Sequence, residues 1–65
     1  MRIDLNGDPY TTRSRTLAAL VEETGAEAGA VATALDGRFV PRGLRAETGL
    51  RAGARVEILS PMQGG

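Results

Sequence analysis

The sequence predicts an α+β domain in which one helix packs across one face of a small mixed sheet. Short segments alternate apolar and polar residues, as strands with one buried face do. Residues 17–21 instead carry apolar side chains at helical spacing. The length of 65 residues leaves room for one small core and no second one. We therefore predict a single domain over residues 1–59, followed by a flexible tail over residues 60–65.

The first strand and its turn are the clearest prediction. Met1, Ile3 and Leu5 alternate with polar residues, and Asn6-Gly7 is typical of a two-residue hairpin turn. A second strand should run through Tyr10 to about Arg13. Pro9 near its start suits an edge position, because proline cannot donate to a strand ladder.

A short amphipathic helix should follow. The hydroxyls of the Ser14–Thr16 segment can cap it, and Leu17, Leu20 and Val21 would form its buried stripe. Gly25 stands where a glycine commonly ends a helix. So short a helix is unstable alone, so the stripe must lie on the sheet.

The second half of the chain predicts the rest of the sheet. Residues 30–35 and 38–40 should form a hairpin around Asp36-Gly37, and residues 54–59 should form the last strand beside the first. The stretch 42–53 has no sustained alternation, so we expect an irregular crossover pinned to the core by Leu44 and Leu50. The expected core residues come from all of these elements: Ile3, Leu5, Leu17, Leu20, Val21, Val31, Leu35, Val40, Leu50, Val56 and Ile58.

Composition argues against several classes of function. The chain has no histidine, cysteine or lysine, and so lacks the usual general base and strong nucleophiles. We therefore expect it not to be an enzyme and to bind no metal or cofactor itself. Zero net charge argues against a nucleic-acid partner. The N-terminal residues lack a signal-peptide pattern and no segment could span a membrane, so we expect a soluble, cytoplasmic protein.

The C-terminal residues point to a function as a substrate. The chain ends in Gly64-Gly65 directly after the expected last strand. Six extended residues reach about 20 Å, far enough to enter the cleft of another protein. Glycine has no Cβ, so the end can pass through a narrow slot. Termini are often rich in small residues, so this signal depends on the domain that carries it.

The chain resembles the ThiS family, the sulfur carrier proteins of thiamine biosynthesis, over essentially its whole length. Four motifs carry the resemblance: Asn6-Gly7, Asp36-Gly37 with Phe39-Val40-Pro41-Arg42, Val56-Glu57-Ile58, and Gln63-Gly64-Gly65. Two positions depart from the family pattern: Ala54 stands where an acidic residue is common, and an aromatic residue is often found near Leu44. The resemblance implies the β-grasp, ubiquitin-like fold.

The resemblance also implies a mechanism. An adenylating ThiF-type partner would use ATP and magnesium to activate the carboxylate of Gly65. Sulfur from cysteine, delivered by way of a cysteine desulfurase, would convert it to a thiocarboxylate. A ThiG-type thiazole synthase would then take the sulfur, and the free carrier is expected to be a monomer.

The same resemblance suggests which residues meet the partners. Met62, Gln63 and Gly64 would be gripped with the tail, and Pro61 would limit the tail's freedom before binding. Docking would use the sheet face away from the helix, where Ala32, Ala34 and Leu59 are as well explained by the core as by an interface. Surface charges such as Arg42 are better explained as solvated side chains.

Two other readings stay open. The small subunit of molybdopterin synthase, or another Gly-Gly sulfur carrier, would share the fold and the chemistry but serve a different acceptor. A ubiquitin-like modifier would instead join Gly65 to a target lysine, and a passive interaction module would not use the tail. The mass added to Gly65 would separate a sulfur carrier from a modifier, because a thiocarboxylate changes the mass only slightly whereas conjugation adds a whole protein.

Overall fold

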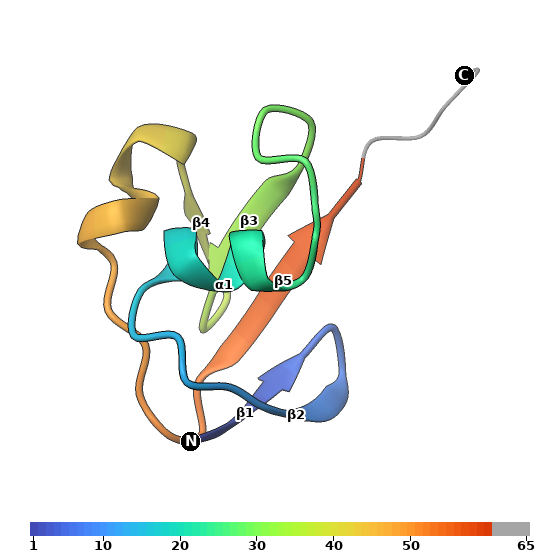
Figure 1. The fold of residues 1–65 in the computed structure, drawn as a ribbon, viewed down its shortest axis with the longest axis vertical. Helices are drawn as coiled ribbons and strands as arrows, with labels where there is room; N and C mark the ends of the chain where they lie inside the picture. Colours follow the sequence, from blue (N-terminus) through green and yellow to red (C-terminus); the bar gives the residue numbers. More distant parts are fainter. Residues whose placement is uncertain (61–65) are drawn as a thin grey trace.

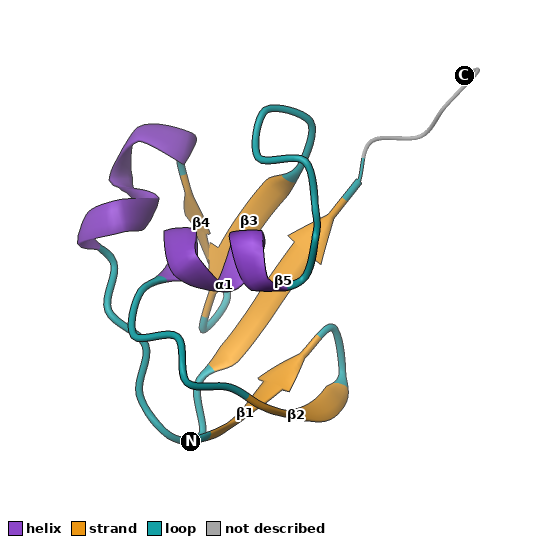
Figure 2. Cartoon of the chain, in the orientation of Figure 1, coloured by secondary structure: helices purple, strands orange, loops and turns teal. Residues whose placement is uncertain are grey.

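In the computed structural model, which describes residues 1–60, one helix crosses one face of a five-stranded sheet (Figures 1 and 2). In chain order, the elements are β1 (Arg2–Leu5), β2 (Asp8–Thr11), α1 (Leu17–Glu23), β3 (Ala32–Leu35), β4 (Arg38–Val40), the 3-10 helix η1 (Arg42–Glu47) and β5 (Arg55–Leu59). The strand order is β2-β1-β5-β3-β4. The two central strands, β1 and β5, run parallel, and the other pairs are antiparallel. The predicted mixed sheet with the last strand beside the first is confirmed.

Both predicted hairpin turns are confirmed by their backbone angles. Asn6 and Gly7 have φ of 53° and 89°, and Asp36 and Gly37 have φ of 51° and 85°. Positive φ at both central residues gives the turn whose twist matches that of paired strands. Pro9 lies in β2, at one outer edge of the sheet, as predicted.

The helix begins and ends as its sequence indicates. The Thr16 hydroxyl accepts a hydrogen bond from the Ala19 amide at 3.1 Å and so satisfies one of the free donors of the first turn. After the helix, Gly25 takes a left-handed conformation with φ of 78°. The predicted stripe of Leu17, Leu20 and Val21 is buried.

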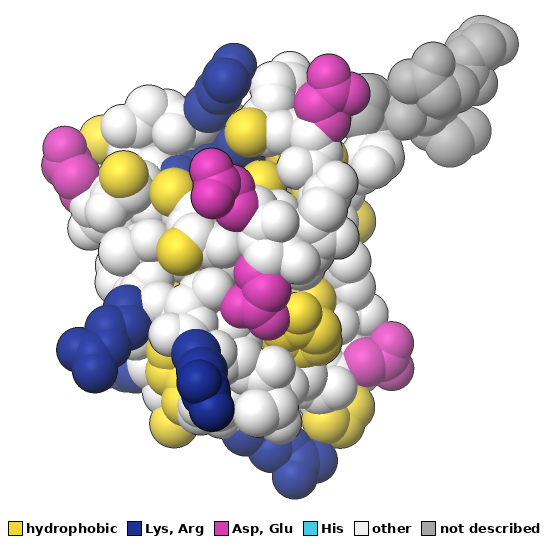
Figure 3. All heavy atoms as spheres, in the orientation of Figure 1, with side chains coloured by type: hydrophobic (Ala, Val, Ile, Leu, Met, Phe, Trp, Pro, Cys, Tyr) yellow, Lys and Arg dark blue, Asp and Glu magenta, His cyan; other side chains and the backbone are white. Residues whose placement is uncertain are grey.

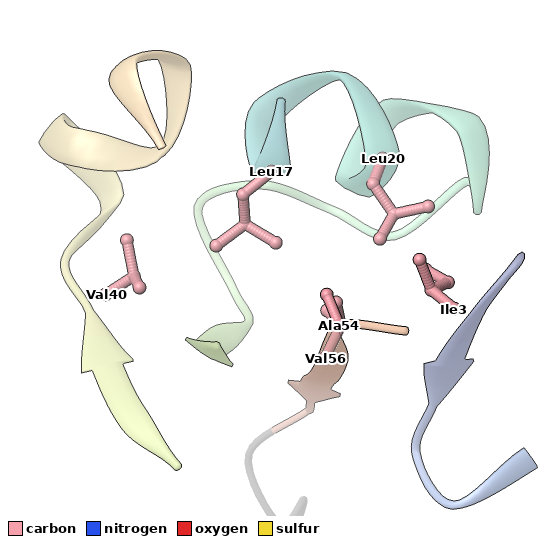
Figure 4. Close-up of a cluster of buried hydrophobic side chains, with 6 residues drawn as sticks. All are labelled: Ile3, Leu17, Leu20, Val40, Ala54 and Val56. Atoms are coloured by element: carbon pink, nitrogen blue, oxygen red, sulfur yellow. The ribbon is translucent and has the colours of Figure 1, made fainter. Parts of the chain in front are cut away.

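The core lies between α1 and the sheet. Figure 4 shows Leu17 and Leu20 pointing from the helix toward side chains of β1, β4 and β5. The buried cluster consists of Ile3, Leu17, Leu20, Val40, Ala54 and Val56, and Val21 is buried as well. Five further side chains pack against it and are partly buried: Leu5, Tyr10, Leu35, Leu50 and Ile58. Ten of the eleven predicted core residues are therefore buried or pack on the core, and Val31 is half-buried.

The crossover differs from the prediction. Its first half is the 3-10 helix η1 rather than irregular chain, and Leu44 is 50% exposed, so the prediction that Leu44 pins the crossover is wrong. The tight turn of η1 directs the next side chain, Arg45, inward instead, where it is 4% exposed. Leu50 contacts the core as predicted.

Three strand boundaries also differ. β2 ends at Thr11 rather than about Arg13, and β5 begins at Arg55 rather than at residue 54. β3 begins at Ala32 rather than at residue 30. The carbonyl of Val31 accepts a hydrogen bond from Arg45 at 2.7 Å, so the chain before Ala32 is held by a side chain rather than by a neighbouring strand.

Candidate functional site

The last strand, β5, is the element that leads to the predicted functional tail. It occupies the centre of the sheet, with β1 on one side and β3 on the other. Its final residue, Leu59, lies opposite Ala32 of β3, and Ser60 is the last described residue. The pairing with β3 therefore holds β5 up to its last residue.

The side chain of Asn6 adds a further contact to the end of β5. The Asn6 Nδ2 donates to the carbonyl of Ile58 at 3.1 Å, and the amide of Ile58 donates to Oδ1 of Asn6 at 2.9 Å. A hollow of about 190 Å³ lies beside this contact. Its lining residues come from the first hairpin, the end of the helix and the end of β5: Leu5, Asn6, Thr24, Ala26, Ile58 and Ser60.

Four of the predicted site residues, Met62, Gln63, Gly64 and Gly65, lie outside the described residues, as does Pro61. Their roles therefore stay predictions. Leu59 is the one predicted site residue within residues 1–60, and it is 55% exposed.

The sheet face opposite α1 carries an apolar patch. The registers place Ala34 opposite Phe39 and Ala32 opposite Leu59, and these side chains point away from the helix because Thr33 and Val40, their neighbours in sequence, are buried beneath it. We call the residues Ala32, Ala34, Phe39 and Leu59 the open-face patch. Ala32 is exposed and Ala34 half-buried, so the structure places both on the predicted docking face, outside the core cluster.

Phe39 was missed as a candidate for this face. It is the only phenylalanine of the chain and is 69% exposed. The alternation of strand side chains could have found it, because assigning Val40 to the core sends the preceding side chain to the other face. An exposed aromatic side chain beside other apolar residues is typical of a protein-binding surface.

Charged side chains of both signs border the open-face patch. Glu57 lies opposite Ala34, and Arg55 lies opposite Asp4 of β1. All three are on the outer face, because their neighbours in sequence face the core: Val56 lies between Arg55 and Glu57, and Leu5 follows Asp4. The face therefore combines an apolar centre with a polar border, as interfaces commonly do.

The helix side of the molecule has a different character (Figure 3). Several basic side chains gather at the end near the N-terminus and another lies at the opposite end, while acidic ones lie over the helix and around the rest of this face. Backbone hydrogen bonds join the segments that carry four arginines at that end. The amide of Gly53 donates to the carbonyl of Arg2, and the amide of Leu50, the neighbour of Arg51, donates to the carbonyl of Arg15. The amide of Thr12, the neighbour of Arg13, donates to the carbonyl of Met1. The two charge types are thus partly separated on this side, although the net charge is zero.

One carboxylate on this side is tightly bonded. Glu23 accepts hydrogen bonds from the hydroxyls of Thr12, Tyr10 and Ser14. These hydrogen bonds lower the pKa of Glu23 from 4.5 to about 2, and the bond from Thr12 has the largest effect. The hydrogen bond to Glu23 in turn raises the pKa of Tyr10. Glu23 therefore stays ionised and fastens the β2–α1 connection to the end of the helix.

Within residues 1–60, no group of three potential ligands among aspartate, glutamate, histidine and cysteine lies close enough together to hold a metal ion. In the same part of the chain, no helix is long and apolar enough to cross a membrane.

Comparison with known proteins gives a consistent result. The family model described as "ThiS family" matches residues 3–65. The crystal structure of the thiamine biosynthesis protein ThiS from Geobacter metallireducens is similar at a TM-score of 0.85 with 29% sequence identity, and the match covers 100% of both chains. The solution NMR structure of a thiamine biosynthesis protein from the same organism is similar at 0.82 with 29% identity, over 100% of this chain and 88% of that one. A search of the curated proteins gives no significant match.

The family match extends through both glycines at the C-terminus, and the structural match shows the same mixed sheet and helix. Family and fold therefore agree with what the sequence motifs suggest, and the chain belongs to the ThiS family.

Proposed function

We propose that this chain is a sulfur carrier of thiamine biosynthesis, and that its reactive group is the C-terminal carboxylate of Gly65. The observation that carries the proposal is the family match over residues 3–65, which includes the whole tail. The similarity to a ThiS chain over the full length of both proteins supports it. The carrier is a co-substrate of partner enzymes rather than a catalyst.

The carboxylate needs activation before it can accept sulfur. An α-carboxyl group has a pKa of about 3.3 to 3.7, so it is ionised at neutral pH and resists a nucleophile. We propose that an adenylating partner of the ThiF type joins it to the α-phosphate of ATP and releases pyrophosphate. Magnesium and cationic side chains of that partner would neutralise the phosphate charge.

Sulfur transfer then replaces the adenylate. A persulfide, formed from cysteine by a desulfurase, attacks the acyl carbon, so that a C–S bond forms and the C–O bond to AMP breaks. A thiol reductant cleaves the remaining S–S bond and leaves the thiocarboxylate on Gly65. A thiazole synthase of the ThiG type takes the sulfur, and the carrier returns to its carboxylate form.

The open-face patch and the tail would serve as the two parts of one docking surface. Leu59 belongs to the patch and lies at the end of β5, directly before the tail. A partner that covers Phe39 and Leu59 would thereby hold the domain while Met62, Gln63 and Gly64 enter its active site. A few side chains near the centre of an interface contribute most of the binding free energy, and aromatic side chains are common among them.

Intact mass spectrometry tests the proposal. The protein is incubated with ATP, magnesium, a persulfide source, a thiol reductant and a ThiF-type adenylating enzyme. We expect the mass to rise by the difference between sulfur and oxygen, and the product to react with a thiol-alkylating reagent. Because oxidation of Met1 or Met62 adds nearly the same mass, the alkylation step is essential.

A matched pair of variants locates the sulfur. A chain lacking Gly65 still ends in a glycine carboxylate but is one residue shorter, and we expect it not to be modified. Gly43→Ala, a change in η1 away from the tail, should be modified like the parent. An unmodified parent chain, or attachment of a whole protein instead of one sulfur atom, would contradict the proposal.

A further inference from the structure

We propose that Asn6 is a positioning residue that fixes the point at which the C-terminal tail leaves the sheet. The inference rests on the proposed function, because it concerns the presentation of Gly65 to a partner. Three observations carry it: the two hydrogen bonds between Asn6 and Ile58, the end of β1 at Leu5, and the position of Ile58 two residues before the last described residue.

The end of β1 at Leu5 leaves the hydrogen-bond ladder between β1 and β5 one step short. The amide of Asp4 donates to the carbonyl of Ala54 at 2.9 Å, and the amide of Asn6 donates to the carbonyl of Val56 at 2.9 Å. The next carbonyl in this alternating series belongs to Ile58. The backbone of β1 cannot reach it, because the chain turns away at Asn6.

The side chain of Asn6 takes the place of the missing peptide group. An asparagine side chain ends in an amide with one carbonyl oxygen and one NH2 group, the same acceptor and donor that a backbone peptide offers. Its Oδ1 accepts from the Ile58 amide and its Nδ2 donates to the Ile58 carbonyl. The parallel ladder thus continues one step beyond the end of the strand.

Few residues could meet both demands of this position. The backbone of Asn6 has φ of 53°, a conformation that glycine, asparagine and aspartate tolerate best. Glycine would fit the backbone but has no side chain. Aspartate would accept from the Ile58 amide, but its second oxygen would face the Ile58 carbonyl oxygen without a proton to donate. Asparagine alone of the three provides both the acceptor and the donor.

The contact holds the side of β5 that β3 does not hold. β3 bonds β5 up to the pair Ala32 and Leu59, whereas on the other side the backbone register with β1 ends at Leu5 and Val56. Without the Asn6 amide, the last part of β5 would be held from one side only. The tail would then start from a looser base, and a partner would have to order more chain on binding.

The second hairpin provides a matched control. Asp36 also has a positive φ, 51°, and it also holds β5 through two hydrogen bonds. Its amide donates to the Arg55 carbonyl at 2.7 Å, and its Oδ1 accepts from the Arg55 amide at 2.9 Å. Arg55 is at the beginning of β5, the end far from the tail. Asn6→Gly therefore removes two side-chain hydrogen bonds near the end of β5, and Asp36→Gly removes one at its beginning.

Two measurements on the parent chain, Asn6→Gly, Asn6→Asp and Asp36→Gly test the inference. The first is the steady-state rate of adenylation by a ThiF-type enzyme, measured as pyrophosphate release against carrier concentration. We expect both Asn6 variants to raise KM about tenfold with little change in kcat, since ordering one more backbone residue lowers affinity by about that factor. Asp36→Gly should stay within about twofold of the parent, because general destabilisation leaves the tail's base intact.

The second measurement is amide hydrogen exchange by NMR, which needs no partner enzyme. In Asn6→Gly the Ile58 amide should exchange at least about tenfold faster than in the parent, and in Asn6→Asp, which keeps the acceptor for this amide, the acceleration should be smaller. In Asp36→Gly the Arg55 amide should exchange faster instead, with Ile58 unchanged.

The outcomes separate the inference from the proposed function. A parent chain that is adenylated, together with equal KM values for Asn6→Gly and Asp36→Gly, would overturn the positioning role and leave the carrier function standing. A parent chain that is not adenylated would overturn the carrier function and the positioning role that rests on it. Unchanged exchange at Ile58 in both Asn6 variants would overturn the inference whatever the kinetics show.

Discussion

The Arg45 guanidinium donates a hydrogen bond from Nε to the Thr33 hydroxyl at 2.9 Å, and both side chains are almost completely buried. The other two nitrogens of Arg45 donate to the carbonyls of Ala28 and Val31, and the Thr33 hydroxyl donates to the carbonyl of Val40. This network joins η1, the loop before β3, and the β3–β4 hairpin. A buried charge is tolerated here because each nitrogen of the guanidinium finds an acceptor.

Arg45→Met should destabilise the fold substantially. The substitution fills much of the space with apolar atoms but leaves the Ala28 and Val31 carbonyls without their donor. We expect a loss of about 3 kcal/mol, since unsatisfied buried polar groups cost about 1–3 kcal/mol each. Urea denaturation of this variant and of Arg51→Met, a change at an exposed arginine, measures the difference. Equal midpoints for the two variants would contradict the structural role of Arg45.

The hydroxyl cluster on Glu23 predicts a pH dependence of stability. The folded pKa of about 2 lies below the unfolded value of 4.5, so the stabilisation is complete above about pH 5 and is lost as the pH falls from 4.5 to 2. Glu23→Gln should therefore be less stable than the parent at pH 7, and the two should converge near pH 2. Because Glu23 is exposed, solvent screening limits the size of the effect.

Thermal unfolding between pH 2 and pH 7 checks this prediction, with Glu22→Gln as the control. Glu22 is the neighbouring exposed glutamate of α1. A constant difference between parent and Glu23→Gln across this range would show that the hydroxyl bonds do not favour the ionised form.

Gly25 and Gly43 should respond in opposite ways to alanine. Gly25 has φ of 78°, whereas no positive φ is found at Gly43, and no atom lies within 4 Å of a Cβ added at either position. Both positions therefore have room for a methyl group, and they differ only in the backbone φ angle. We expect Gly25→Ala to cost about 1 kcal/mol, and Gly43→Ala to be neutral or slightly stabilising. Chemical denaturation gives both values, and equal effects would contradict the assigned backbone conformations.

Phe39 should matter for binding and little for folding. Its ring is 69% exposed, so Phe39→Ser should change the free energy of unfolding by no more than about 0.5 kcal/mol. If the open-face patch docks the adenylating partner, the same change should weaken binding by about 2 kcal/mol, as loss of a central aromatic residue does. Leu44→Ser is the matched control, because Leu44 is also an exposed apolar side chain, at 50%, but lies on η1, outside the patch. Titration calorimetry that gives the same affinity for both variants would remove Phe39 from the interface.

Sequence reasoning predicted the elements that depend on local rules. The two turns, the Thr16 cap, Gly25 and the leucine stripe of α1 each follow from neighbouring residues, and the structure confirms them. The parallel pairing of β1 with β5 followed from the need to place a last strand in the sheet. The membership of the ThiS family followed from motifs spread along the chain.

Arg45 shows why the rest could not be predicted. A charged residue is expected at the surface, so a search for apolar anchors in the crossover chose Leu44. Whether a guanidinium can be buried depends on acceptors at Ala28, Val31 and Thr33, which only the folded chain brings together. The Asn6 contact was missed for the same reason, since its partner, Ile58, is 52 residues away in the sequence. The predicted tail contacts Met62 and Gln63 lie outside the described residues and stay predictions.

The two outer edges of the sheet bear on how the protein behaves in a crowded cell. β2 forms one edge and contains Pro9, which has no amide hydrogen to donate, and β4 forms the other and is only three residues long. Neither edge offers a long row of free donors and acceptors to a second sheet. Strand-to-strand aggregation is therefore disfavoured, although the same molecule exposes an aromatic side chain. The protein can therefore expose the open-face patch for binding while its protected sheet edges keep it from forming fibrils.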